Sequence, residues 1–243
     1  MGQRLKVLVV GCSSGVGFQD LGFQPITPHE AYGVSRVTFI HGDITKPETL
    51  WPACHGMDAV VCAAGARAGW RLPCWNLDTP KCVDFQGVKD LSEAAALAGV
   101  PKFVLVSSVA VTRTCDKISL LLNTLFGRVL HWKFLGEEAV RQAYRHEDLA
   151  YYIVRPGGLN NNLGGMQGLT IEQGDQGNGR VSRIDVASVV VACVEGHSTP
   201  NVSFEVYNNK NKYAPEEDLK KLYSLEPDEP REDDAQVTGM LLP

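Results

Sequence analysis

The sequence lacks any long hydrophobic run. No apolar stretch approaches the ~20 residues that a membrane-spanning helix needs, and an apolar β-branched run begins almost at the first residue. We therefore expect neither a transmembrane segment nor a targeting segment, and a cytoplasmic chain as written. A chain whose presequence had already been removed would look the same.

Patterns typical of disulfide frameworks and metal sites are also missing. The seven cysteines are scattered, odd in number and contain no CxxC pair, and the six histidines are equally dispersed. Scattered cysteines indicate reduced thiols in a reducing compartment. Neither residue type has the spacing of metal ligands, so we predict no metal site.

There is no basic excess, because the formal net charge is −5. A polyanion would meet no attractive field, which disfavours nucleic-acid binding. What the chain does have is 243 residues with 44% hydrophobic content. That is enough to bury the core of one α/β domain or of two small ones, and we favour one.

Short apolar runs rich in β-branched residues recur along the chain and predict buried parallel strands. They are Leu5–Val10, Val37–Ile40, Ala59–Ala63, Phe103–Val106, Tyr151–Val154 and Phe204–Tyr207. Most are separated by stretches with helical periodicity: Thr79–Ala98, Leu125–Arg145 and Ile184–Glu195. This alternation predicts an α/β fold, a doubly wound Rossmann-like parallel sheet in a single domain, with ligands beyond the carboxyl ends of the strands.

Composition changes near the C-terminus. We expect an NAD(P)-binding domain over residues 1–208 and a polar, acidic tail, partly disordered, over 209–243. Pro215–Leu225 can form one short helix, but Glu226–Gln236 holds six acids against one base. A solvated tail is the favoured interpretation, and a docking segment for a protein partner is the alternative.

The first βαβ unit is short for this fold. After the first turn, a doubly wound fold needs a helix of about a dozen residues and a second strand that presents the group reading the adenosine ribose. Phe18–Arg36 must supply both, yet it contains two glycines and two prolines. Either cofactor affinity is weakened, or the sequence lacks roughly 20 to 30 residues of a usual unit.

A glycine-rich turn directly follows the first predicted strand. Its glycines let the backbone approach a pyrophosphate, whose charge free N–H groups at a helix start can stabilise. Serine hydroxyls in the turn can add donors. We predict phosphate binding, with an ordinary glycine turn as the alternative. The predicted ligands are Gly11, Ser13, Ser14, Gly15, Val16 and Gly17.

This turn resembles the cofactor turn of short-chain dehydrogenases/reductases, and later segments resemble the atypical, NmrA-like branch of that superfamily. Those segments are Val83–Leu91, Ala98–Val100, Lys102–Ser108 and Tyr151–Leu159. Trp132-Lys133 with Gly136-Glu137-Glu138 is similar to the NADP-binding proteins associated with chloroplast protein import and their cyanobacterial and algal relatives. The resemblance implies NADP, or NAD, as cofactor, and a plastid stroma location for a processed chain.

The resemblance also implies roles at the ends of two further strands. Asp43 would bond adenine and Ile44 would cover its face, although Asp43 can instead cap the helix expected near Pro47. Ala63-Ala64-Gly65 would leave room for the cofactor ribose, with close packing as the alternative.

Similar pairs of alternatives apply at the next strand ends. Ser107 and Ser108 would hold the cofactor and a substrate carbonyl, or satisfy strand-end backbone groups. Pro156-Gly157-Gly158 would lie near the nicotinamide, or form a tight turn. Substrate would contact the variable region Asn160–Arg180, where Asn160-Asn161-Asn162 line a polar pocket or form a mobile loop.

The tyrosine–lysine pair of the superfamily is missing. Hydride-transferring members use a tyrosine acidified by a lysine four residues later, and no Tyr-x-x-x-Lys occurs here. Aligned on Trp132-Lys133, His131 stands at the tyrosine place and Leu135 at the lysine place. The candidate catalytic residues are Lys133, which would reach the ribose hydroxyls, Ser108, and His131, for which a structural role is the alternative.

These observations predict an NAD(P)-binding protein of the atypical short-chain dehydrogenase/reductase type, an oxidoreductase or redox sensor without the Tyr–Lys pair. The alternative is a non-enzymatic scaffold or assembly factor that uses the Rossmann fold for protein interaction. The expected partners are a nicotinamide dinucleotide and, through the acidic tail, a protein.

Overall fold

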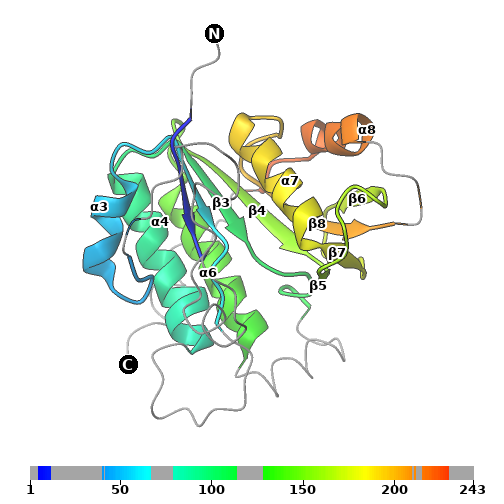
Figure 1. Cartoon of the computed structure of the whole chain (residues 1–243). Helices are drawn as coiled ribbons and strands as arrows, with labels where there is room; N and C mark the ends of the chain where they lie inside the picture. Colours follow the sequence, from blue (N-terminus) through cyan, green and yellow to red (C-terminus); the bar gives the residue numbers. More distant parts are fainter. Residues whose placement is uncertain are drawn as a thin grey trace, which may run out of the picture.

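The computed structural model describes residues 5–11, 40, 42–66, 79–113, 128–209, 211 and 215–229, and helices and strands alternate along them (Figure 1). The strands are β1 (Val7–Val10), β2 (Ala59–Cys62), β3 (Lys102–Val106), β4 (Ala150–Pro156), β5 (Gly158–Asn160), β6 (Leu169–Glu172), β7 (Arg180–Ser182) and β8 (Val202–Asn208). The helices are η1 (Pro47–Thr49), α3 (Leu50–Cys54), η2 (Lys81–Gly87), α4 (Val88–Leu97), α6 (Val129–Ala143), α7 (Arg183–Glu195), α8 (Pro215–Lys220) and η3 (Lys221–Ser224).

Six of these strands form one sheet in the order β1-β2-β3-β4-β8-β6. Neighbours from β1 to β8 are parallel, and β6 adds an antiparallel edge on β8. β5 and β7 form a separate parallel pair. The predicted single-domain, Rossmann-like α/β fold is confirmed. The predicted strand Val37–Ile40, except Ile40, and the shortened segment Phe18–Arg36 lie outside the described residues.

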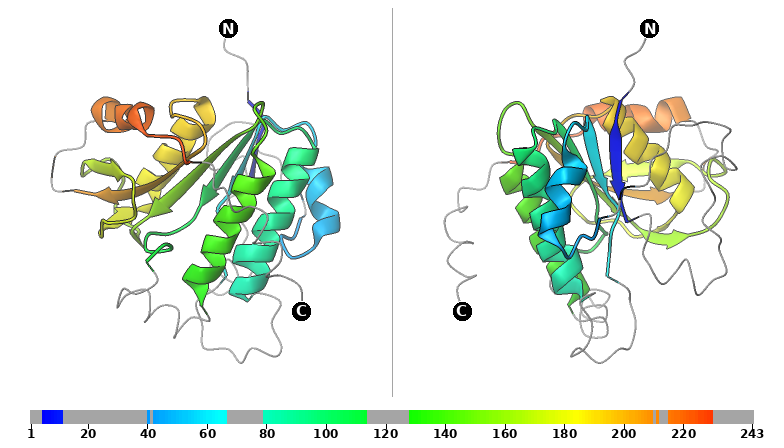
Figure 2. Two further views of the ribbon diagram at one scale, coloured as in Figure 1. Left: turned by 180° about the vertical axis from the view of Figure 1, so that it is seen from behind. Right: turned by 60° about the vertical axis from the view of Figure 1, so that its left-hand side comes forward.

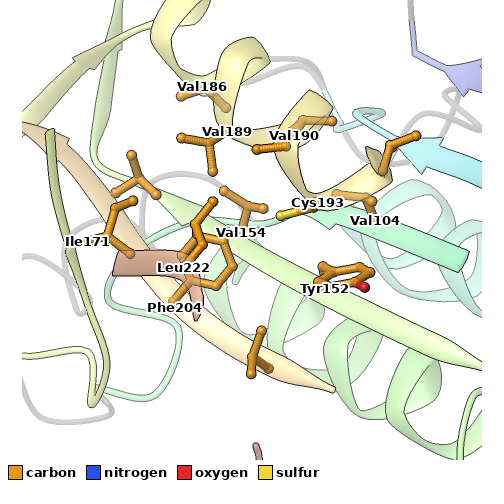
Figure 3. Close-up of a cluster of buried hydrophobic side chains, with 14 of the residues drawn as sticks. Val104, Tyr152, Val154, Ile171, Val186, Val189, Val190, Cys193, Phe204 and Leu222 are labelled. Atoms are coloured by element: carbon orange, nitrogen blue, oxygen red, sulfur yellow. The ribbon is translucent and has the colours of Figure 1, made fainter. Parts of the chain in front are cut away.

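Helices cover both faces of the sheet (Figures 1 and 2). Because side chains alternate along a strand, Phe103 and Leu105 of β3 enter the cluster that packs on α3, α4 and α6. Val104 lies in the opposite cluster, which packs on α7, and Val106 packs against it. Figure 3 shows that second cluster, where Phe204 lies among side chains from β4 and α7. Both faces are buried, so the strand sequences are apolar without polar alternation.

Part of the expected acidic tail folds back onto the domain. α8 and η3 lie on the sheet side that α7 covers, and Leu222 is fully buried in that core. Asp228 then accepts hydrogen bonds from the Ser203 N–H (3.1 Å), the Ser203 hydroxyl (2.6 Å) and the Tyr151 hydroxyl (3.1 Å). Residues 215–229 therefore pack on the domain, whereas 230–243 lie outside the described residues.

The described helices are too short or too polar to cross a lipid bilayer. The longest, α6, has 15 residues and carries the buried Glu137 and the half-buried Lys133, Glu138 and Arg141. Described cysteines are free thiols, and burial raises the pKa of Cys62, at the end of β2, to about 11.

Candidate functional site

The tip of β1 packs directly on the tip of β2. Gly11 has a φ of +100°, and a Cβ added there would lie 2.5 Å from the Ala64 nitrogen and 2.6 Å from the Ala63 carbonyl carbon. Only glycine combines that φ with such close backbone contact. Phosphate contacts stay a prediction for the ligands outside the described residues: Ser13, Ser14, Gly15, Val16 and Gly17.

A buried ion pair lies beside the end of β2. The Lys133 Nζ is 2.7 Å from Asp84 Oδ1, and Asp84 is only 2% exposed. The other carboxylate oxygen accepts the Ala66 N–H at 3.1 Å. A Cβ on Gly65 would come 3.5 Å from Asp84 and 3.6 Å from Lys133. The ammonium of Lys133 is thus fixed at the strand end where the cofactor ribose is expected.

Two helices bring this pair together. Asp84 lies on η2, a π-helix, a form that is frequent at functional sites. Lys133 lies on α6, which approaches so closely that a Cβ on Gly136 would be 2.3 Å from the Asp84 carbonyl oxygen. The segment around Asp84 carries part of the family resemblance, but its sequence pattern indicates no role for Asp84. The stretch Val83–Leu91 holds two acids, and its sequence alone does not separate Asp84 from Asp90.

The structure changes which residue of α6 stands at the place of the missing tyrosine. Lys133 reaches the strand ends, so the tyrosine place is one helical turn earlier, at Val129, and not at His131. Val129 packs against a small apolar cluster with Leu130. His131 lies about 200° around the helix from Lys133, edge-on to Trp132 at 5.1 Å. Burial and the nearby Arg128 lower the pKa of His131.

The two serines after β3 differ. The Ser108 hydroxyl donates to the Val109 carbonyl at 3.1 Å, which is the backbone alternative. Ser107 is 7% exposed, and its N–H donates to Val154. Its buried hydroxyl has no partner among the described residues. Because an unpaired buried hydroxyl costs about 1–3 kcal/mol, Ser107 indicates a ligand.

Asp43 and Ile44 serve the local structure. The Asp43 carboxylate accepts from the Thr45 N–H (3.0 Å) and hydroxyl (2.7 Å). These bonds, with Lys46 at 3.8 Å, lower the pKa of Asp43. It does not cap η1, because Lys46 precedes that helix without a side-chain cap. Ile44 packs close to Gly87. Their adenine contacts stay a prediction.

Pro156, Gly157 and Gly158 make the exit from β4. A Cβ on Gly157 would lie 2.4 Å from the Gly179 carbonyl oxygen, and the Gly158 N–H donates to that oxygen at 2.9 Å. The Gly157 N–H donates to Val206. No tight turn forms, because Gly157 is the single residue between β4 and β5 and neither glycine has a positive φ. The close approach of Gly179 is what requires glycine at 157, while a nicotinamide contact stays a prediction.

A family model described as NAD(P)H-binding matches residues 28–197. The chain belongs to this NAD(P)H-binding family. The predicted kinship with atypical, NmrA-like short-chain dehydrogenases/reductases is confirmed. The matched residues begin after the glycine turn, so they include the Asp84–Lys133 pair and Ser107 but not Gly11.

Relatives of this NAD(P)H-binding protein have varied names. An uncharacterized sugar epimerase of Bacillus subtilis is 29% identical over 73% of this chain and 74% of its own length. Sanguinarine reductase of Eschscholzia californica is 29% identical over 68% of this chain and 70% of its own length. The chloroplastic protein TIC 62 of Arabidopsis thaliana is 29% identical over 76% of this chain but 26% of its own length.

Two solved structures share the fold. An oxidoreductase of Lactococcus lactis has a TM-score of 0.68 and 22% identity, and the alignment covers 93% of this chain and 100% of that one. A short-chain dehydrogenase/reductase of Veillonella parvula in complex with NADP has a TM-score of 0.59 and 15% identity, over 86% and 98% of the two chains. At these identities the likeness shows the fold alone.

A buried charge network lies at the carboxyl end of β4. Arg155, at the end of β4, donates to both carboxylate oxygens of Glu137 at 3.1 and 2.7 Å, and to Glu205 at 3.1 Å. Both glutamates are fully buried. Although burial opposes it, Glu137 and Glu205 raise the pKa of Arg155. The guanidinium therefore stays charged and joins α6, β4 and β8.

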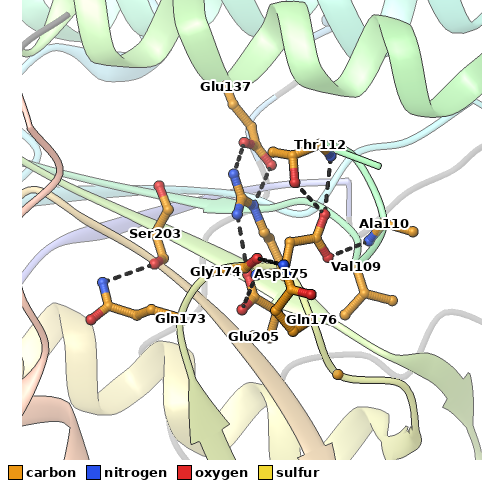
Figure 4. A network of polar contacts seen from close by, with 12 residues as sticks. Val109, Ala110, Thr112, Glu137, Gln173, Gly174, Asp175, Gln176, Ser203 and Glu205 are labelled. Carbon is orange, nitrogen blue, oxygen red and sulfur yellow. Dashed lines mark hydrogen bonds and ion pairs between the residues drawn. The ribbon is translucent and has the colours of Figure 1, made fainter. Parts of the chain in front are cut away.

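Asp175 extends this network to the loop after β3 (Figure 4). Its N–H donates to Glu205 at 2.9 Å. Its carboxylate accepts from the Ala110 N–H (2.6 Å) and the Thr112 N–H (3.0 Å). Arg113 forms an ion pair with the same carboxylate, with its Nη2 3.3 Å from the Asp175 Oδ1. The loop that follows Ser107 is thus tied to the turn after β6.

Glu205 should give the stability a defined pH dependence. Burial raises the pKa of Glu205 above 4.5, although the Asp175 N–H and Arg155 oppose this. A raised carboxyl pKa contributes stability that is present below the unfolded value and lost as pH rises through the folded value. We expect Glu205→Gln to flatten the decline in unfolding free energy above pH ~4.5, measured by urea denaturation.

The exposed acid Glu195 provides the control for this experiment. Glu195→Gln should leave the pH profile of the unfolding free energy as in the wild type. A Glu205→Gln profile as steep as that of the wild type would contradict the assignment.

A polar cleft opens beyond the exit from β4. Its volume is about 450 Å³, and it adjoins a second hollow of about 380 Å³. Asn160 and Asn162 line it, which favours the polar-pocket alternative for these residues. Asn161 instead accepts a hydrogen bond from Arg183 at 2.6 Å. The cleft lies in the region where substrate contacts were expected.

Proposed function

We propose that the chain is an NADP(H)-dependent reductase of a carbonyl or quinone substrate that works without a tyrosine acid. The observation that carries this proposal is the placement, just after the ends of the neighbouring strands β2 and β3, of a fixed lysine ammonium and of a buried serine hydroxyl without a partner among the described residues. Lys133 and Ser107 provide these groups. Redox chemistry on a dinucleotide needs donors at that edge to hold ribose and substrate oxygens.

The described residues fit a dinucleotide. Gly11 lets the end of β1 lie directly against Ala63 and Ala64, which brings the two strand ends together at the place where the phosphates are expected. Ser107 has a buried hydroxyl that needs a partner. Gly11, Gly65, Ser107 and Lys133 would therefore hold the cofactor, which when bound supplies the hydride.

The chain's own residues supply orientation and hydrogen bonds. Lys133 carries three N–H donors, and Asp84 engages the ammonium from one side only. The remaining donors would bind ribose hydroxyls or the substrate oxygen and stabilise the negative charge that develops on it. The Ser107 hydroxyl would orient the same oxygen. Val129, at the tyrosine place, cannot donate a proton, so the Lys133 ammonium would supply the proton that the reduced oxygen takes up after hydride transfer.

We infer a preference for NADP over NAD. It is supported by the NADP named with the Veillonella parvula structure of the same fold. The 2′-phosphate that distinguishes NADP from NAD would need a basic residue, and the nearest candidate, Arg36 at the end of the shortened segment, lies outside the described residues. Comparison of the two reduced cofactors tests this preference directly.

A redox-sensing scaffold is a second candidate function, and Val129 at the tyrosine place favours it. Similarity to TIC 62, and to a protein named a photosystem II assembly factor in Synechocystis, 43% identical over 42% of this chain, supports it further. In that case the dinucleotide would bind without turnover. Asp228, which the domain already binds, would not be available to a protein partner.

Two measurements separate these functions. Quenching and enhancement of NADPH and NADH fluorescence give the two affinities, and NADPH absorbance with a panel of quinones and carbonyls gives turnover. The reductase proposal expects tight NADPH binding and turnover with at least one member. Binding with a flat trace across the panel favours the scaffold, and absence of binding overturns both.

Gly11→Ala should weaken NADPH binding at least about tenfold and cost about 1–3 kcal/mol of stability. The added Cβ would lie 2.5 Å from the Ala64 nitrogen, just after β2. Gly11 also has a positive φ, which L residues rarely adopt. Gly56→Ala is the matched control, because Gly56 also has a positive φ but open space around it. It should lose stability through strain alone and keep wild-type NADPH affinity. Equal affinities for both variants would argue against a cofactor at Gly11.

A further inference from the structure

The cleft beyond β4 carries polar groups that the chain itself does not use. Its two adjoining hollows share three lining residues, Asn162, Gln167 and Asn208. Arg180, on β7, lines the larger hollow. Leu163 and Met166 line the smaller one. The cleft therefore combines amides, one cation and apolar side chains.

The amides at the end of β8 are occupied. Asn208 accepts from the Ser182 N–H at 3.0 Å and donates to Asp185 at 2.9 Å. Asn209 is bonded through both its nitrogen and its oxygen. Asp185 is the acid that lines the cleft, and its second oxygen accepts the Gly165 N–H at 2.7 Å. The described walls thus offer a ligand no free carboxylate.

Other groups in the cleft are free. Within the described part of the chain, the Arg180 guanidinium and the Asn162 and Gln167 side-chain amides have neither a hydrogen bond nor an ion pair, and all three residues are exposed. Arg180 offers five N–H donors in a planar fork that matches a carboxylate. A cation with neutral donors, in a cleft whose acid Asp185 has both oxygens already bonded, is complementary to an organic anion.

The cleft is also preformed. A Cβ on Gly164 would lie 2.4 Å from an Ile184 side-chain carbon, so the loop lies directly on the start of α7. The Ser182 hydroxyl caps α7 by accepting the Asp185 N–H at 3.0 Å. The Gly168 N–H donates to Asn211 at 2.8 Å at the other end of the loop. A site held at both ends loses little entropy when it binds a ligand.

Apolar side chains form one rim. Leu163 is 74% exposed and Met166 is 67% exposed, and both line the smaller hollow. Exposed apolar residues grouped beside a polar cleft mark a binding surface. They favour a ligand whose body is apolar and whose charge lies toward Arg180.

We propose that this cleft binds the substrate as an amphipathic carboxylate. Arg180 pairs with the carboxylate, Asn162 and Gln167 bond the neighbouring oxygens, and the apolar body lies on Leu163 and Met166. This inference rests on the proposed function, because the cleft lies at the same sheet edge as Lys133 and would place a reducible group toward it.

The test uses 3-phenylpropionate and its methyl ester as probes of the full chain saturated with NADPH. The ¹H–¹⁵N signals of the Asn162 and Gln167 amides report binding at the cleft. We expect the acid to shift both signals and to bind at least about tenfold more tightly than the ester. Arg180→Gln should remove this preference and leave NADPH affinity unchanged. Asn162→Asp should weaken binding of the acid and not of the ester.

Arg183→Gln is the matched control, since Arg183 is an exposed arginine at the same edge that does not line the cleft. It should behave as the wild type. Equal binding of acid and ester, no effect of Arg180→Gln, or no shift of either amide overturns the proposal while NADPH binding stands. Failure of the wild type to bind NADPH overturns the proposed function instead, and the acid–ester comparison without NADPH then judges the cleft by itself.

Discussion

We expect Arg155→Met to lower the free energy of unfolding by about 3–5 kcal/mol. The substitution keeps an unbranched apolar side chain but removes the cation that binds Glu137 and Glu205, both fully buried. Two carboxylates would then remain in the core without their main partner. Breaking a buried pair costs more than the pair contributes, because the remaining charge has lost its water.

Urea denaturation measures this loss, and two further variants make it specific. Arg183→Met removes an exposed arginine with a single hydrogen bond to Asn161, and it should cost less than about 0.5 kcal/mol. Adding Glu137→Gln to Arg155→Met neutralises one stranded acid and should recover part of the loss. A cost below about 1 kcal/mol for Arg155→Met would show that the network is not a main source of stability.

Lys133→Met should reduce NADPH-dependent turnover at least about 100-fold. The substitution removes the ammonium expected to bind the ribose and substrate oxygens, while the aliphatic part of the side chain stays. It also leaves Asp84 buried with only the Ala66 N–H. Steady-state rates at saturating NADPH measure the effect on the chemical step, and fluorescence titration measures the effect on binding.

The loss of protein stability caused by an unpaired Asp84 must be separated from the loss of catalysis in this experiment. The double variant Asp84→Asn with Lys133→Met removes the stranded charge, so it should fold better yet remain as inactive as the single variant. Lys81→Met provides the surface control, because Lys81 lies over the Trp132 ring at 5.7 Å, outside the site. It should keep turnover within about twofold. Wild-type activity in the double variant would exclude Lys133 from the reaction.

The fold was largely predictable because both faces of the parallel sheet are buried. Runs such as Phe103–Val106 and Tyr151–Val154 are apolar throughout, and only a covered strand has this composition. The edge strand β6, Leu169–Glu172, was missed. It has four residues in a glycine-rich region and pairs antiparallel with β8. Such a short segment has no periodicity that separates it from a loop.

The candidate site was predictable where a sequence motif shows that the backbone conformation requires glycine. It was not predictable where residues distant in the sequence form ion pairs. The positive φ at Gly11 was predictable because a sharp turn after a strand requires glycine, whereas its phosphate contact stays a prediction. Asp84 and Glu137 were missed as functional or structural partners, since a single acid in a helical stretch has the same pattern as a solvated one. Only the packing of α6 on η2 and β4 shows that both acids are buried.

The dyad register was misplaced for a related reason. Sequence reasoning anchored it on Trp132-Lys133 and so placed the lysine at Leu135. The angular position of a side chain about the helix axis decides whether it reaches the sheet. A shift of two positions along the helix changes this angle by about 200°. The structure shows Lys133 turned toward Asp84, which makes Val129 the residue at the tyrosine place.

The register of the main sheet has a consequence for how the chain reaches this structure. Val9 pairs with Val61 and Val104 with Tyr152, so each pairing joins segments that a whole crossover separates. No described strand pair of this sheet is a hairpin that could form early from neighbouring residues. Each must first close a long loop, whose entropy opposes the transition state. We expect refolding on the slow side for a chain of this size, with collapse preceding strand pairing.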